Sequence, residues 1–169
     1  MKTLSGCSDP KELLTWMNKN LTYHGVNKGK IWTPEEVLVH KKGHCWETAE
    51  FAYHEFTVLK LNPILLYIQT PDESVTHLTT IFMQNNQFYW YEWVWPANKG
   101  ISGPYNDFQE IVNYIRTRFI TEHKNIGQVL YGNSFIKKNM TELQYFTELQ
   151  KNWTEFKINA NIKNIYHQW

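Results

Sequence analysis

Residues 43–47 read Gly-His-Cys-Trp-Glu, and they mark the point where a turn passes into a long helix. After Cys45, apolar side chains recur at helical spacing as far as about Lys60 and define one face of that helix: Ala49, Ala52, Tyr53, Phe56 and Leu59. Cys45 precedes Ala49 by four residues and therefore shares its inward face. The stretch predicts a thiol in the first turn of a helix that packs on the rest of the fold.

A thiol at this position can be reactive. The partial positive charge at a helix N-terminus lowers the pKa of a cysteine and makes its thiolate available near neutral pH. The backbone N–H groups of Cys45 and Trp46 could stabilise the oxyanion of a carbonyl under attack, and Gly43 would allow a tight turn and a close substrate approach. The alternative is that Cys45 is only a small buried apolar residue, as lone cysteines on apolar helix faces often are.

Two shorter helices are predicted before this one. Asp9-Pro10-Lys11-Glu12 has the pattern of an N-cap, a proline at the first helical position and a capping box, and the apolar spacing continues to about Asn20. Thr33-Pro34-Glu35-Glu36 repeats the pattern and predicts a helix that ends before Gly43.

Three strand-like runs follow the long helix, at residues 64–69, 75–84 and 88–95, and they predict an antiparallel meander. If Asn85-Asn86 forms a two-residue hairpin turn, Thr79 faces Glu92 and His77 faces Val94. His77 and Glu92 are then diagonal neighbours on one face, within reach of a hydrogen bond. His77 is thus the best-placed base for Cys45, although a cross-strand contact with Thr79 or a lysine would also account for Glu92.

The remaining third of the chain predicts a loop at residues 100–104 and a helix capped by Asn106 or Asp107. The helix has an apolar face: Phe108, Ile111, Val112, Ile115 and Phe119. A short strand at 128–131 and a last helix over about 140–156 complete the prediction. We expect one α+β domain over residues 1–169, with a core at about 9–96 and a C-terminal helical extension at about 104–169.

Composition limits the possible partners. The 17 Lys and Arg against 16 Asp and Glu give a net charge of +1, which argues against nucleic acid and anionic membranes. The aromatic run at 88–95 could stack a ligand, but a sheet covered on both faces also explains it. No metal-binding motif joins the histidines to Cys45, and we expect no metal or other cofactor. The two cysteines, Cys7 and Cys45, form no disulfide framework, and no leader or membrane span is recognisable, so we expect a cytoplasmic protein.

The motif Gly43-x-Cys45, His77 and Glu92 in this order resembles the transglutaminase-like core of the papain-type cysteine enzymes. The lead-in at residues 33–38 and the helix entry at 42–47 are similar to that family as well, and the resemblance covers about residues 10–96. It implies a papain-like fold with Cys45 as nucleophile, His77 as general base and acid, and Glu92 as the third residue of a triad. Glu92 departs from the family pattern, which usually has Asp there.

The resemblance implies a cysteine-dependent hydrolase or acyltransferase that cleaves amide bonds of a protein or peptide through a thioester. We favour a peptidase or amidase over amine crosslinking. The alternative is a fold that has lost catalysis and binds a protein or another ligand. Gly43, His44 and Trp32 are the candidate residues of the substrate groove, and we expect the His44 side chain to be exposed to solvent beside the site.

Overall fold

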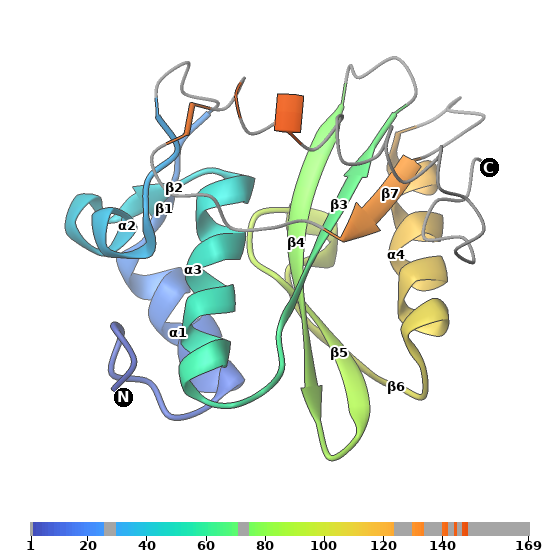
Figure 1. The fold of residues 1–169 in the computed structure, drawn as a ribbon, viewed down its shortest axis with the longest axis horizontal. Coiled ribbons are helices and arrows are strands. Elements are labelled where there is room, and N and C mark those ends of the chain that lie inside the picture. Colours follow the sequence, from blue (N-terminus) through green and yellow to red (C-terminus); the bar gives the residue numbers. More distant parts are fainter. Residues whose placement is uncertain are drawn as a thin grey trace.

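The computed structural model describes residues 2–25, 30–70, 75–123, 130–133, 140–141, 144 and 147–148. An antiparallel sheet of five strands forms its centre, in the order β6-β5-β4-β3-β7. Helices cover both faces of the sheet (Figure 1). The strands are β3 (Ile64–Gln69), β4 (Thr76–Gln84), β5 (Gln87–Glu92), β6 (Gly100–Tyr105) and β7 (Leu130–Asn133).

The hairpin between β4 and β5 has the predicted register. Gln84 pairs with Gln87 and Thr80 with Tyr91. Asn85 and Asn86 both have positive φ, 53° and 60°, as a two-residue type I′ turn requires. The turn therefore fixes which residues of β4 and β5 share a face.

The first two helices begin where their capping residues predict. In α1 (Pro10–Asn20), Asp9 accepts from the N–H groups of Lys11 and Glu12. The Glu12 side chain, however, accepts from Ser8 instead of completing a capping box with Asp9. In α2 (Pro34–His40), the capping box between Thr33 and Glu36 is complete.

Helix α3 (Cys45–Val58) is more deeply buried than its sequence predicts. The apolar spacing predicts one inward face, but Phe51 and three glutamates on the other sides are buried too: Glu47, Glu50 and Glu55. The reason is that α3 lies between the sheet on one side and α1 and α2 on the other (Figure 1).

Two layers of apolar side chains enclose the sheet. On one face, Phe82 and Tyr91 of the sheet pack with residues of α1, α2 and α3. On the opposite face, Ile81 and Trp90 pack against α4 (Phe108–Glu122), which Asp107 caps. The sheet is thus covered on both sides, which accounts for much of the aromatic run in β5.

The predicted loop at 100–104 is wrong, because these residues form β6. Glycine and proline in this stretch suggest a loop, but β6 is an edge strand that pairs only with β5, and an edge tolerates both residues. Trp95 leads into a short 3₁₀ helix (Pro96–Asn98) before this strand.

The sheet also extends beyond the predicted core of residues 9–96, since β6 and β7 both belong to it. The strand predicted at 128–131 corresponds to β7, which pairs with β3, although residues 128–129 lie outside the described residues. Most of the helix predicted at 140–156 also lies outside them. A two-stranded parallel pair, β1 (Thr22–Tyr23) with β2 (Lys42–Gly43), was not predicted.

Candidate active site

Cys45 is the first residue of α3, as the sequence predicts, and its side chain is half-buried. It lies at the N-terminus of the helix, which carries a partial positive charge. His44, which precedes it, and His77 of β4 are close enough to the thiol to lower its pKa. The fold therefore brings together the predicted thiol and the predicted base.

His77 is held by Glu92 from the neighbouring strand. The His77 Nε2 atom lies 2.7 Å from Glu92 Oε2, in the diagonal arrangement that the hairpin register predicts. Because Nε2 is occupied by the carboxylate, Nδ1 is the ring nitrogen that remains for Cys45. The Trp95 ring packs edge-on against the imidazole, with 5.6 Å between the ring centroids.

The Glu92 carboxylate is itself fixed by the backbone. Its Oε1 atom accepts from the N–H groups of Val94 and Trp95, at 2.8 and 2.9 Å. The side chain is 2 % exposed, so these bonds replace water that burial removes. The glutamate is thereby placed to orient the imidazole, with one oxygen on the ring and the other on the loop after β5.

The charges of these three groups support one another. Burial by itself raises the pKa of Cys45, but hydrogen bonds and the charges of His44 and His77 outweigh it and lower the pKa from 9.0 to about 7. Burial lowers the pKa of His77, but Glu92 and the contact with Cys45 raise it to about 10. For Glu92, His77 and the two N–H bonds overcome burial and lower the pKa. These opposite shifts favour the thiolate–imidazolium pair over the neutral thiol and imidazole.

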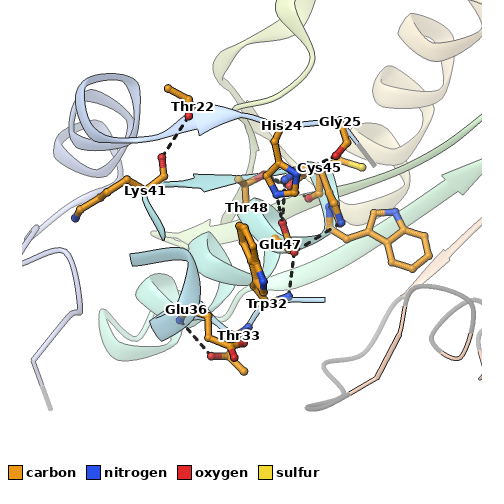
Figure 2. A network of polar contacts seen from close by, with 12 residues as sticks. Thr22, His24, Gly25, Trp32, Thr33, Glu36, Lys41, Cys45, Glu47 and Thr48 are labelled. Carbon is orange, nitrogen blue, oxygen red and sulfur yellow. Dashed lines mark hydrogen bonds and ion pairs between the residues drawn. The ribbon is translucent and has the colours of Figure 1, made fainter. Parts of the chain in front are cut away.

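A second carboxylate organises the start of α3, and Figure 2 shows its contacts. Glu47 is fully buried and accepts from the N–H groups of Trp32 and His44 and from His24 Nε2, at 3.0, 3.1 and 3.0 Å. His24 Nδ1 lies 2.8 Å from the Gly25 carbonyl oxygen. Glu47 thus ties two segments before α3 to its first turn.

The His44 side chain is buried, with 1 % exposure, so the expectation that it faces solvent is wrong. Its Nδ1 atom accepts from the Trp46 N–H at 3.1 Å, and it is the N-cap of α3. This bond occupies one of the two predicted oxyanion donors. Among the described residues no acceptor binds the Cys45 N–H, which leaves it as the backbone donor at the thiol.

Gly43 is required by packing at the helix start. A Cβ atom at this position would lie 2.8 Å from the Thr48 Cγ2 atom. The close approach that the sequence assigned to a substrate is therefore made by the first turn of α3 itself.

The Trp32 ring stacks on His40, with 4.3 Å between centroids.

His77 lines a cavity of about 560 Å³. None of the three predicted groove residues, Gly43, His44 and Trp32, lines it. Its walls come from β1, the start of β4, the segment after β5 and the end of α4, so no local sequence pattern reveals it.

Two further buried glutamates of α3 differ in their hydrogen bonding. Glu55 accepts from the N–H groups of Leu4 and Ser5 and from the Ser5 hydroxyl, and so anchors the N-terminal segment. Glu50 Oε1 has no hydrogen-bond partner among the described residues. Burial, together with the nearby charge of Glu47, raises the pKa of Glu50 to about 8.

Sequence reasoning missed the roles of His24 and Glu47. A signal was available for Glu47, because it stands three residues after the N-cap, the spacing of a capping box. It was overlooked because histidine is an unusual N-cap. Nothing local indicates His24, which reaches Glu47 only through the pairing of β1 with β2.

In the part of the chain that the structure describes, no cluster of three His, Cys, Asp or Glu side chains is arranged to hold a metal ion. None of the described helices combines the length and the apolar character needed to cross a bilayer. Comparison with known proteins finds no matching family model and no curated protein with significant sequence similarity.

Proposed function

We propose that this protein is a cysteine-dependent amide hydrolase with a papain-like, transglutaminase-like core, in which Cys45, His77 and Glu92 form the catalytic triad. The observation that carries the proposal is the buried His77–Glu92 pair at 2.7 Å, which leaves Nδ1 for a thiol at a helix N-terminus. Nucleophile, base and orienting carboxylate in this relation are the pattern of nucleophilic acyl transfer. The order of the three residues along the chain and the helix-on-sheet placement of Cys45 agree with the family resemblance.

In the proposed reaction the Cys45 thiolate attacks the carbonyl carbon of an amide. The carbonyl oxygen becomes an oxyanion, which the Cys45 N–H is placed to stabilise. The imidazolium of His77 then gives its Nδ1 proton to the leaving nitrogen, the C–N bond breaks, and a thioester remains on Cys45. Neutral His77 next takes a proton from water, hydroxide adds to the thioester, and the carboxylic acid leaves as the thiolate–imidazolium pair is restored.

Glu92 supports both halves of this cycle. It accepts the Nε2 proton of His77, which keeps Nδ1 as the atom that exchanges protons with the substrate. The longer side chain, compared with the Asp usual in the family, reaches both the ring and the N–H groups of Val94 and Trp95. The glutamate therefore has the contacts that the third member of a triad needs.

The test is detection of the thioester. Purified protein is mixed with a library of N-acylated peptide amides and with activated acyl esters, and intact mass is measured after acid quenching. We expect an acyl adduct on the native protein and none on Cys45→Ser. If no donor acylates the native protein and Cys45→Ser behaves identically, the enzyme proposal is lost and a binding module is the remaining interpretation.

A further inference from the structure

The cavity beside His77 has mostly apolar walls. Trp93, Trp95 and Phe119 contribute to them, and each of these residues is at most 6 % exposed. A cavity of about 560 Å³ is large enough for one aromatic amino-acid side chain with its backbone. The walls therefore suit an apolar, ring-sized group.

The position of the cavity assigns it to one side of the scissile bond. His77 lines the cavity, whereas Cys45 does not. In the proposed mechanism the acyl group stays on Cys45, while the group that exchanges a proton with His77 is the leaving amine, and later water. A group held in this cavity is therefore on the leaving side of the amide.

The cavity has a cationic group at its edge. The Lys99 ammonium lies 4.5 Å from the centroid of the Trp93 ring, and partial desolvation lowers its pKa. Gly100, the next residue, pairs with Glu92, so the lysine lies beside the triad end of β5. Among the described residues no carboxylate lies within ion-pair distance of Lys99.

One carboxylate, that of Glu122, also lines the cavity. Its Oε2 atom accepts from the Trp95 indole N–H, so it is engaged by the wall. The His77 ring is paired with Glu92, whereas Lys99 lines the cavity with no ion-pair partner among the described residues. Lys99 is therefore the group that can pair with an anion at this end of the cavity.

We propose that this cavity binds a leaving group that combines an apolar, ring-sized body with a carboxylate, as an aromatic amino acid at the C-terminus of a peptide does. Lys99 is the specificity-determining residue for the carboxylate, and Trp93 and Trp95 contact the apolar body. The inference rests on the proposed function, because the mechanism assigns the cavity to the leaving side.

The assignment separates hydrolysis from amine crosslinking. A primary amine carries a positive charge near neutral pH, and the Lys99 ammonium, which lines the cavity, would repel it. Water is uncharged and is not repelled in this way. The charge pattern therefore favours a hydrolase that releases a carboxylate-bearing product over an enzyme that joins amines to acyl groups.

The test uses three ligands with the same ring and chain and different charge: 3-phenylpropanoate, neutral 3-phenylpropanamide and cationic 3-phenylpropylamine. Each is titrated into the native full chain, and the indole N–H signals of Trp93 and Trp95 are followed by NMR. We expect 3-phenylpropanoate to bind with a Kd on the order of 1 mM. We expect the amide to bind about three- to fivefold more weakly, and the amine more weakly still.

Lys99→Gln should remove the preference for the carboxylate while retaining binding of the amide. Lys11→Gln, which changes an exposed lysine of α1 away from the cavity, is the matched control and should leave all three affinities unchanged. Equal affinities, preference for the amine, no binding of any ligand, or a preference that survives Lys99→Gln would each overturn the inference. Because binding needs no thiol chemistry, these outcomes are independent of the thioester test.

Discussion

Two carboxylate–imidazole pairs lie near the start of α3, one buried and one half-buried, and they differ in what the second ring nitrogen contacts. In the His77–Glu92 pair, Nε2 binds the carboxylate and Nδ1 is left for the thiol. In the His24–Glu47 pair, Nε2 binds the carboxylate, but Nδ1 binds the Gly25 carbonyl oxygen. Structural groups therefore occupy both nitrogens of His24, whereas Nδ1 of His77 is left for the Cys45 thiol.

The comparison shows that a buried His–Glu hydrogen bond does not by itself indicate catalysis. Glu47 also accepts two backbone N–H groups and so fixes the segments around the helix start. Glu92 accepts two backbone N–H groups as well, but the ring that it orients lines a cavity and contacts a thiol. We therefore propose proton transfer for the His77–Glu92 pair and a structural role for the His24–Glu47 pair.

The largest expected effect separates the two histidines. His77→Ala should slow the burst of 4-nitrophenolate from 4-nitrophenyl acetate at pH 7.5 by about 10²–10⁴-fold, because the thiol loses its base. His24→Ala should change the burst rate of the folded protein by less than about tenfold, since Glu47 and the Gly25 carbonyl oxygen engage both nitrogens of its ring. Equal losses in the two variants would contradict the assignment.

The next effect concerns the orientation of the His77 ring. In Glu92→Gln the amide oxygen can still accept from Val94 and Trp95, which leaves the NH₂ group facing His77 Nε2. That arrangement forces the proton onto Nδ1, where it prevents the ring from accepting a proton from Cys45. We expect about a 10²–10⁴-fold loss in the burst rate, with the melting temperature measured in parallel. Retention of full activity would show that Glu92 does not set the tautomer.

Glu47 should matter mainly for stability. Glu47→Ala removes the acceptor of three buried or half-buried donors, and we expect a loss of about 3–5 kcal/mol in the free energy of unfolding by urea. The matched control is Glu36→Ala, which breaks the other complete capping box at a carboxylate that is 37 % exposed. Its loss should be about 1 kcal/mol or less. Similar losses in both variants would refute the architectural role of the Glu47 network.

The smallest effect tests Glu50, the buried carboxylate whose Oε1 lacks a partner. Its pKa is raised from 4.5 to about 8, so the folded state binds more protons than the unfolded state between these values, and its contribution to stability falls as pH rises from about 4.5 to 8. Glu50→Gln should remove this slope and gain about 1–3 kcal/mol at pH 8 relative to the native chain. Urea denaturation at pH 5 and pH 8 measures it. An unchanged slope would show that Glu50 does not titrate in this range.

The sequence predicted the elements whose determinants are local. Capping residues and apolar spacing located α1, α2 and α3, and Asn85-Asn86 set the register that places His77 diagonal to Glu92. The conformation of a two-residue turn depends on its own residues. The pairing of side chains across the hairpin therefore follows without knowledge of the rest of the fold.

Features that depend on distant contacts could not be predicted in the same way. Strand β6 contains Gly100, Gly103 and Pro104, and only its place at the sheet edge makes such a strand possible. The three buried glutamates of α3 have the spacing of a polar face. Their burial could not be predicted, because nothing near them in the sequence shows that other segments cover them. The cavity beside His77 likewise needs four separate parts of the chain.

The most direct test of the central claim is the rate of Cys45 alkylation by iodoacetamide as a function of pH. The measurement uses a Cys7→Ser background, with and without His77→Ala, so that Cys45 alone reacts. We expect a thiolate titration near pH 7 with His77 present and a shift to well above pH 8 in its absence. A thiol that titrates near its ordinary value of 9.0, or that does not react and is indifferent to His77, would contradict the account.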